Sequence, residues 1–235
     1  MRKIIALFLS ITLILALVAG GNTNSEMQRK AALDTDKTTS ESSEPTSEAL
    51  PDERDILGKR TLVAYFSWAD NAEKGEIDAI TSASVTIPGN VAQLAAWVAE
   101  ETNGDLFSIQ VVAPYPSDWN ECLNRANQEK ADAARPELAQ GVENMEEYDV
   151  VFLGYPNWWY SCPMAILSFI ESHDLSGKQI YLFCSHGTGG LAGSVQDITA
   201  ALPNSNISEN VFDVNEDDIT DSREKINEWL KSIED

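Results

Sequence analysis

Three segments of the sequence combine small, polar and aromatic residues in the way that ligand-binding loops do. The first segment begins with Ser67 and Trp68 and ends with Gly89, Asn90 and Val91, where a helical pattern starts. A glycine lets the backbone approach a ligand closely, and the free N–H groups at a helix N-terminus bind phosphate. A Gly-Asn pair is also an ordinary way to begin a helix. The segment is therefore a candidate phosphate site, with a plain helix cap as the alternative.

The second segment reads YPNWWY over residues 155–160 and follows an apolar run. One interpretation is a hydrophobic flap that folds onto the core or contacts another copy of the chain. The other is an aromatic wall for a flat ligand, because indole faces stack well and form large apolar surfaces. The residues that would form this wall are Pro156, Asn157, Trp158 and Trp159.

The third segment, SHGTGG, occupies residues 185–190 and also follows an apolar run. A plain turn rarely needs three glycines, whereas glycines near a strand end let backbone amides approach a ligand. For the histidine alone, a structural or exposed side chain is the other interpretation. The candidate contacts are Ser185, His186, Gly187, Thr188 and Gly189.

The elements that would position these segments alternate after residue 60. Continuous apolar runs are typical of strands that are covered on both faces. These runs occupy residues 61–66, 105–112, 148–153, 179–185 and 207–214. Segments with helical spacing of apolar residues separate the runs and follow the last one. The alternation predicts an α/β fold with a doubly wound, five-stranded parallel sheet.

The caps of two helices can be predicted from residue type. Asn90 is the expected N-cap of the first long helix, and Asn103-Gly104 is its expected stop. Asp221 and Glu224 are the expected capping pair of the last helix. These caps set where each helix begins relative to the loop before it.

The three ligand-binding segments should meet in space, because they follow the first, third and fourth predicted strands. The carboxyl ends of parallel strands lie at one edge of a doubly wound sheet, and ligands bind there where the winding reverses. A phosphate site, an aromatic plane and a glycine-lined polar edge together suit a mononucleotide with a planar heterocycle. FMN is the simplest ligand with these three parts.

The chain from about residue 61 to residue 233 resembles the flavodoxin-like family. The motifs that carry the resemblance are VAYFS, PGNVAQLA, PYPSDW, ARPEL, FLGYPNWW and FCSHGTGG. The resemblance implies a three-layer sandwich with strand order 2-1-3-4-5, noncovalently bound FMN and redox chemistry. It assigns the first segment to the phosphate and the other two segments to the edges of the isoalloxazine ring.

Two features depart from the family pattern. Residues 69–88 split a phosphate loop that is usually compact, and they are mainly acidic in their charged residues. Val91 stands where the family commonly has Thr, so one hydroxyl donor to the phosphate is missing. Thr86 and Ser67 are the candidate replacements. We expect FMN to bind in the micromolar range or tighter, but more weakly than in electron-carrier flavodoxins.

The N-terminal part predicts export. Residues 1–21 have a basic start, an apolar run and small residues at the end, as in a cleaved signal. An uncleaved signal, the alternative, would be the only membrane contact. The segment LVAGG resembles a lipobox of bacterial lipoproteins without its cysteine, which excludes lipidation there. Residues 22–59 predict a disordered acidic and Ser/Thr-rich linker, and 60–235 the folded domain. We therefore expect an extracytoplasmic bacterial protein, secreted or membrane-associated.

Composition excludes two classes of site. The formal net charge of −22 argues against nucleic-acid binding, which needs cationic side chains. The chain has two histidines and three cysteines without metal-ligand spacing, so no metal site is expected. Cys162 and Cys184 lie in apolar surroundings and are expected to be buried thiols, with a disulfide as the alternative.

The sequence therefore predicts an FMN-binding redox protein that is either an electron carrier or an NAD(P)H-dependent reductase of small acceptors such as quinones. Its partners besides FMN would be NAD(P)H or a protein redox partner. No catalytic acid, base or nucleophile is assigned, because the flavin ring itself carries the electrons. The alternative is a flavodoxin-fold binding module that has lost its cofactor. A hydrolase is disfavoured because no GxSxG motif is present.

Overall fold

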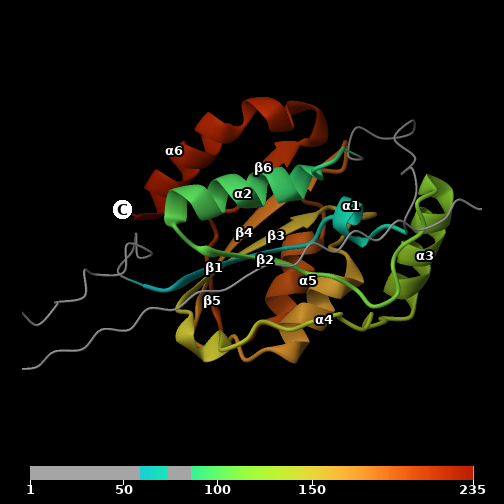
Figure 1. Cartoon of the computed structure of the whole chain (residues 1–235), viewed down its shortest axis with the longest axis horizontal. Helices are drawn as coiled ribbons and strands as arrows, with labels where there is room; N and C mark the ends of the chain where they lie inside the picture. The colour runs from blue at the N-terminus through green and yellow to red at the C-terminus, as the bar shows by residue number, and fades with distance from the viewer. Residues whose placement is uncertain (1–58, 74–85, 235) are drawn as a thin grey trace, which may run out of the picture. The chain divides into compact units, whose positions relative to one another are not determined.

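The computed structural model in Figure 1 describes residues 59–73 and 86–234. The predicted export signal, the predicted linker up to residue 58 and residues 74–85 of the insert lie outside the described residues.

Parallel strands form a single sheet in the centre of the domain (Figure 1). The strands are β1 (Thr61–Tyr65), β2 (Asp105–Ser108), β3 (Val150–Pro156), β4 (Gln179–His186), β5 (Asn206–Ile207) and β6 (Phe212–Asn215). Their order is β2-β1-β3-β4-β5, and β6 pairs with β4 as well. The predicted doubly wound parallel sheet and its strand order 2-1-3-4-5 are confirmed.

The predicted fifth strand over residues 207–214 is divided into β5 and β6. β5 pairs with the start of β4, and β6 pairs with its end. Between them, the Asn210 N–H donates to Ser208 Oγ and the Val211 N–H donates to the Glu209 carbonyl oxygen, both at 3.1 Å. These amides bond locally instead of to β4, so a short turn interrupts one strand position at the edge of the sheet.

β2 is also shorter than the predicted strand, which extended to residue 112. Val111 forms an isolated bridge with Leu138. The Val112 N–H donates to the Glu137 carbonyl oxygen, and the Ala139 N–H donates to the Gln110 carbonyl oxygen, both at 2.8 Å. The Ile109 N–H still donates to the Tyr65 carbonyl oxygen of β1 at 2.7 Å. The chain then leaves β1 and pairs with the segment that follows the third helix.

Helices cover both faces of the sheet, which confirms the three-layer arrangement. Figure 1 shows α2 and α6 together on one side of the strands, and α4 and α5 on the other. A single-turn helix, α1, follows β1 at the edge where the sheet's strands end. The helices are α1 (Trp68–Asn71), α2 (Asn90–Thr102), α3 (Trp119–Ala131), α4 (Met164–Ser172), α5 (Ser194–Ala201) and α6 (Arg223–Glu234).

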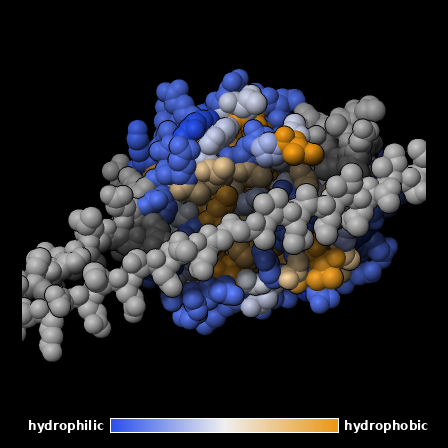
Figure 2. Space-filling model, in the orientation of Figure 1, coloured by the Kyte–Doolittle hydropathy of each residue, from blue (hydrophilic) through white to orange (hydrophobic). Residues whose placement is uncertain are grey.

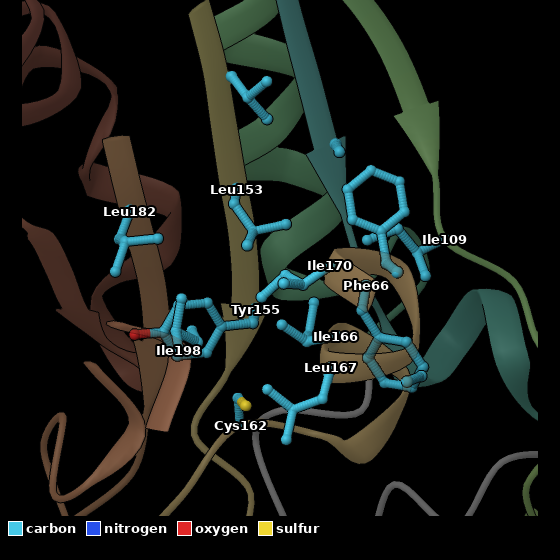
Figure 3. Close-up of a cluster of buried hydrophobic side chains, with 14 of the residues drawn as sticks. Phe66, Ile109, Leu153, Tyr155, Cys162, Ile166, Leu167, Ile170, Leu182 and Ile198 are labelled. Atoms are coloured by element: carbon cyan, nitrogen blue, oxygen red, sulfur yellow. The ribbon is translucent and has the colours of Figure 1, made fainter. Parts of the chain in front are cut away.

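Both faces of β3 are buried, which explains its uninterrupted apolar run. Leu153 and Tyr155 point to the same side as Ile166 of α4, as Figure 3 shows. Phe152 points to the opposite side, where its ring lies edge-on to Trp229 of α6 with 5.7 Å between centroids. Successive residues thus supply the two hydrophobic layers and hold the end of β3 in a fixed position.

α2 begins one residue later than the predicted cap. Gly89 is the N-cap, and Asn90 is the first helical residue, without a side-chain capping bond. The first helical hydrogen bond runs from the Gln93 N–H to the Gly89 carbonyl oxygen at 3.0 Å. Asn103 ends the helix in the left-handed conformation with φ of 51°, as expected. The side chain of Asn90 is therefore available for another role.

α6 does not begin with the predicted pair of Asp221 and Glu224. Asp221 is the last residue of a 3₁₀ helix over Glu216–Asp221. The first bond of α6 runs from the Ile226 N–H to the Ser222 carbonyl oxygen at 3.0 Å. This 3₁₀ helix therefore stands directly before α6, where the capping pair was expected.

The three cysteines are buried and free, which confirms the buried thiols expected for Cys162 and Cys184 and adds Cys122 to them. They are Cys122, Cys162 and Cys184. Burial raises the pKa of the Cys122 and Cys162 thiols to about 12. These thiols are therefore poor nucleophiles, because the thiolate is the reactive form.

The face of the domain in Figure 2 carries hydrophilic side chains around much of its outline, with apolar residues between them. The large apolar side chains that are most exposed are Ile87, Leu106, Val112 and Tyr160. Within residues 59–73 and 86–234, no helix is both long and apolar enough to cross a membrane.

Candidate functional site

A cavity of about 310 Å³ lies where β1, β3 and β4 end. Every residue predicted from the three segments lines it, except Gly89. The pair Trp158 and Trp159 therefore shares one cavity with Asn90 at the start of α2. The added lining residues are Trp119, Tyr160 and Glu216. The predicted meeting of three loops at one edge of the sheet is the arrangement found.

Gly89 does not line the cavity but packs against residues next to it. A Cβ atom placed on Gly89 would collide with the Ser67 hydroxyl oxygen and also crowd Ala69. The glycine therefore lets the start of α2 pack directly against the loop after β1. The N–H groups of the first turn of α2 precede the first helical hydrogen bond and have no partner within the helix. The start of α2 is thus held at the cavity by close backbone packing.

Asn90 lines the cavity and has a buried hydrogen-bond donor without a partner. Its Oδ1 accepts a hydrogen bond of 3.1 Å from Thr86 Oγ1. Its Nδ2 is buried and has no hydrogen-bond partner in the described part of the chain. The Thr86 hydroxyl also lies 3.0 Å from the Pro88 carbonyl oxygen, so its single proton is shared between two acceptors. An unpaired buried donor is unfavourable by about 1–3 kcal/mol, which indicates a missing acceptor.

Val91 contributes to the core as well as to the cavity. It is 2% exposed and packs in the layer that includes Leu94 and Phe183. Its side chain brings no polar group to the cavity. Of the two proposed replacements for the missing hydroxyl, Ser67 lines the cavity, whereas Thr86 acts through Asn90.

The second segment turns sharply at Trp158–Ser161. Two backbone hydrogen bonds join Trp158 and Ser161, at 2.9 and 3.1 Å. The central residues, Trp159 and Tyr160, have φ of 47° and 69°. This is the region that two-residue hairpin turns require and that Gly and Asn favour. For larger residues it costs about 1–2 kcal/mol each.

The aromatic residues of this segment form a continuous wall. The Trp158 ring lies edge-on to Phe66 at 5.2 Å and to Tyr115 at 5.1 Å between centroids. The Trp159 ring lies 5.2 Å from Trp158 and 5.9 Å from Trp119. Both indoles are partly buried against the core and line the cavity. Trp158 and Trp159 therefore do both things that were considered for this segment: they pack against the core and they line the cavity.

Tyr115 packs against Trp158 and is itself held by hydrogen bonds and a cation–π contact. Its hydroxyl donates to Glu129 Oε2 at 2.8 Å, and the Arg125 guanidinium lies 4.0 Å from the centre of its ring. Arg125 Nε donates to Glu129 Oε1 at 2.8 Å. Burial, followed by the Glu129 carboxylate, raises the Tyr115 pKa. The network keeps Tyr115 neutral and fixed beneath Trp158.

Asn157 lines the cavity and has a buried hydrogen-bond acceptor without a partner. Its Nδ2 donates to the Gly190 carbonyl oxygen, which fixes the orientation of the amide. Its Oδ1 is buried and has no hydrogen-bond partner in residues 59–73 and 86–234. Two residues that line the cavity therefore each have one buried amide atom without a partner, a donor on Asn90 and an acceptor on Asn157.

His186 combines a structural contact with its position at the cavity. Its Nδ1 lies 2.8 Å from the Gly187 carbonyl oxygen, and its Nε2 lies 2.8 Å from Asp213 Oδ2. Glu216 lies beside the same loop, since a Cβ on Gly187 would be 3.2 Å from Glu216 Oε1. The two carboxylates make this side of the cavity acidic.

Among the described residues, the cavity has neither a cluster of metal ligands nor a cationic side chain. No group of three or more His, Cys, Asp or Glu residues in the described part of the chain could hold a metal ion. Within residues 59–73 and 86–234, no Lys or Arg lines the cavity. An anionic ligand would therefore depend on the start of α2, the amide of Asn90 and other N–H or O–H groups.

A model of the flavodoxin family matches residues 60–233. The chain belongs to the flavodoxin family. Among solved structures, a candidate flavoprotein from Bacteroides uniformis shares 29% identity, with a TM-score of 0.58 over 74% of this chain and 99% of that one. A candidate flavoprotein from Bacteroides eggerthii shares 30% identity, with a TM-score of 0.54 over 72% of this chain and 98% of that one.

A more distant structure shares the fold of this flavodoxin-family domain. It is a flavoprotein from Lactobacillus acidophilus in complex with FMN, 15% identical, with a TM-score of 0.50 over 71% of this chain and 99% of that one. A search of curated proteins found no match.

Sequence reasoning missed three residues of the flavodoxin-family site. Trp119 stands in the PYPSDW motif, but its distance from the three segments gave no sign that α3 brings it to the cavity. Tyr160 is part of YPNWWY, but the sequence did not show that the turn directs it to the cavity and away from the core. Glu216 follows the edge strand β6, whose pairing with the end of β4 was not predicted. The acidic residues that follow Glu216 were the only sequence feature that could have pointed to its place in the site.

Proposed function

We propose that this flavodoxin-family domain binds FMN noncovalently and serves as a redox protein. The observation that carries the proposal is the aromatic-lined cavity at the ends of β1, β3 and β4, whose lining residues include two asparagines that each have an unpaired amide atom. Asn90 Nδ2 can donate and Asn157 Oδ1 can accept, and neither has a partner in the described part of the chain. The volume of about 310 Å³ lies at the lower end of the range for small-ligand sites.

The residues present suit the three parts of FMN. Asn90 and the free N–H groups at the start of α2 would hold the phosphate. Trp158 and Trp159 supply apolar ring surfaces for a planar heterocycle. Asn157 Oδ1 would accept a hydrogen bond from an N–H or O–H group of the cofactor. The glycines of the third segment would bring backbone amides to its polar edge.

The flavin supplies the redox chemistry when it is bound, and the protein supplies binding and electrostatics. The aromatic wall excludes water from one side of the cavity. Glu216 and Asp213 disfavour additional negative charge nearby, so we expect them to lower the reduction potential of the site. The FMN complex of the Lactobacillus acidophilus flavoprotein supports the same use of the fold.

The direct experiment is an absorption spectrum of the protein purified without added flavin, followed by anaerobic reduction. Bound flavin should give a band near ~450 nm that bleaches on reduction. If added FMN produces no bound flavin band after gel filtration, the cofactor-free binding module is the correct interpretation. The buried Val91, which offers no hydroxyl to a phosphate, is the observation that favours this second candidate.

The electron partners and the location form part of the proposal. We infer from residues 1–21 that the protein works outside the cytoplasm, either released or held by an uncleaved signal. Cell fractionation with N-terminal sequencing tests this, and a cytoplasmic protein that starts at Met1 would contradict it. The donor is NAD(P)H or a redox protein. Turnover with NADH or NADPH and a quinone would identify a reductase, and its absence would leave the carrier function.

A further inference from the structure

His186 has a hydrogen-bond acceptor at each nitrogen of its ring. Its Nδ1 lies 2.8 Å from the Gly187 carbonyl oxygen, and its Nε2 lies 2.8 Å from Asp213 Oδ2. The side chain of His186 is 12% exposed, so water has little access to the two contacts. A neutral imidazole has one N–H donor and one acceptor lone pair. It can therefore satisfy one of these contacts but not both.

Both contacts are satisfied when each ring nitrogen carries a proton. A carbonyl oxygen and an ionised carboxylate can accept hydrogen bonds but cannot donate them. A lone pair in place of either N–H would face an acceptor oxygen at 2.8 Å. The geometry therefore suits an imidazolium at His186, and its charge offsets that of the Asp213 carboxylate.

The other histidine of the chain has the opposite surroundings. The Val142 N–H donates to His173 Nε2 at 2.9 Å, so this nitrogen must present a lone pair. The His173 Nδ1 lies 2.9 Å from the Phe169 carbonyl oxygen and carries the proton of a neutral ring. The chain has two histidines, so His173 is an internal reference for the protonation of His186.

The position of His186 makes its proton relevant to the cavity. His186 lines the cavity, whereas Asp213 reaches the ring from the edge strand β6 and does not line it. Glu216, in the 3₁₀ helix after β6, lies on the other side of the ring's loop, near Gly187. In the described part of the chain, the cavity lining contains no Lys or Arg. The imidazolium would therefore supply its positive charge.

Two further titratable groups near Asp213 stay neutral. Burial raises the pKa of the Tyr155 hydroxyl on β3, and the Asp213 carboxylate raises it further. The same two causes, in the same order, raise the pKa of the Cys184 thiol on β4. Asp213 and Glu216 are therefore the ionised groups that act on His186 from the neighbouring elements.

We propose that the proton shared by His186 and Asp213 controls the charge of the cavity wall and thereby the redox behaviour of the site. The inference rests on the proposed function, in which the cavity holds FMN. Loss of the proton adds one negative charge to the wall, and negative charge nearby opposes reduction. Asp213 therefore lowers the reduction potential only after the pair has lost its proton, so the effect depends on pH.

The first test follows the ring nitrogens of the full-length, ¹⁵N-labelled protein by NMR, without flavin. The spectra distinguish a nitrogen that carries a proton from one with a lone pair, and they are recorded from about pH 5 to pH 9, where histidine titrates. Asp213→Asn removes the carboxylate that faces His186 Nε2. Asp218→Asn removes the same charge from an exposed position of the 3₁₀ helix and is the matched control.

We expect both His186 nitrogens to carry protons at the acid end of the range and one to lose its proton as the pH rises. His173 Nε2 should be unprotonated while His186 is still fully protonated. Asp213→Asn should bind the second His186 proton about tenfold or more weakly, because a neighbouring opposite charge shifts a titration by about 1–3 pH units. Asp218→Asn should titrate as the wild type does.

The second test measures the reduction potential of the FMN-loaded protein over the same pH range. Where the wild-type pair holds its proton and the Asp213→Asn variant has lost it, the pair is neutral in both proteins, and their potentials should agree. Above that range the wild-type potential should fall below that of the variant. Asp218→Asn should differ from the wild type by a constant offset.

Three results would overturn the inference. The first is a single protonated nitrogen on His186 throughout the pH range. The second is an unchanged His186 titration in Asp213→Asn. The third is a constant difference in potential between the wild type and Asp213→Asn, with no divergence as the pair loses its proton. Absence of FMN binding would refute the proposed function and the redox part of the inference, whereas the spectra without flavin still decide the proton assignment.

Discussion

Replacement of Asn157 by leucine should weaken FMN binding without destabilising the FMN-free protein. Leucine has the same branching and the same number of side-chain heavy atoms, but it can neither donate to Gly190 nor accept a hydrogen bond. Loss of the bond to Gly190 should cost about 0.5–1.5 kcal/mol. Removal of the unpaired buried Oδ1 should return about 1–3 kcal/mol. The free energy of unfolding should therefore stay the same or rise by about 1 kcal/mol.

The effect on the FMN-bound state should have the opposite sign. If Asn157 Oδ1 accepts a hydrogen bond from FMN, its loss removes about 0.5–1.5 kcal/mol of binding free energy, or roughly a 2- to 12-fold increase in Kd. Isothermal titration calorimetry measures this, and urea unfolding with and without FMN measures the change in stability.

A matched control is available in α6. Asn227 Oδ1 is also buried without a partner in the described part of the chain, but Asn227 does not line the cavity. Asn227→Leu should therefore leave the Kd for FMN unchanged. The reasoning would be refuted if Asn157→Leu bound FMN as tightly as the wild type, or if both variants lost affinity equally.

Three further predictions follow from packing and burial. Gly154→Ala should lower the free energy of unfolding by about 1–3 kcal/mol in urea titrations, because its Cβ would overlap the Phe183 ring; an unchanged midpoint would contradict the packing. Val91→Thr should tighten FMN binding in calorimetry but destabilise the FMN-free protein by about 1–3 kcal/mol, because the site is 2% exposed; weaker FMN binding would contradict this. Cys122 and Cys162, with pKa raised to about 12, should not react with a thiol reagent in the native protein at pH 8. The stability that they contribute is complete below about pH 8.5 and is lost as the pH rises towards 12, which pH-dependent urea unfolding measures.

The position of the site could be predicted from the sequence because it depends on topology. Strands that are buried on both faces, such as β3, read as continuous apolar runs. Once the sheet is parallel, the residues after β1, β3 and β4 must share an edge. Ser67, Trp158 and His186 could thus be placed in one cavity although they are far apart in the sequence.

The missing details depend on tertiary contacts that residue type does not reveal. The WWYS segment contains neither Gly nor Asn, so nothing predicted positive φ at Trp159 and Tyr160. The role of Gly89 as a packing residue appears only when Ser67 lies against it. Asn90 was expected to cap α2, but Gly89 takes that place and the Asn90 amide lines the cavity. Local propensity is a weak guide where packing decides the conformation.

The central claim is that the start of α2 and the aromatic wall bind one molecule of FMN between them. Calorimetric titration of the flavin-free protein with FMN and with riboflavin, which lacks the phosphate, tests it most directly. The account predicts one FMN site with a Kd in the micromolar range or tighter, and riboflavin binding weaker by about tenfold or more, the loss of a charge-assisted hydrogen bond. No binding at saturating FMN, or equal affinity for the two flavins, would contradict it.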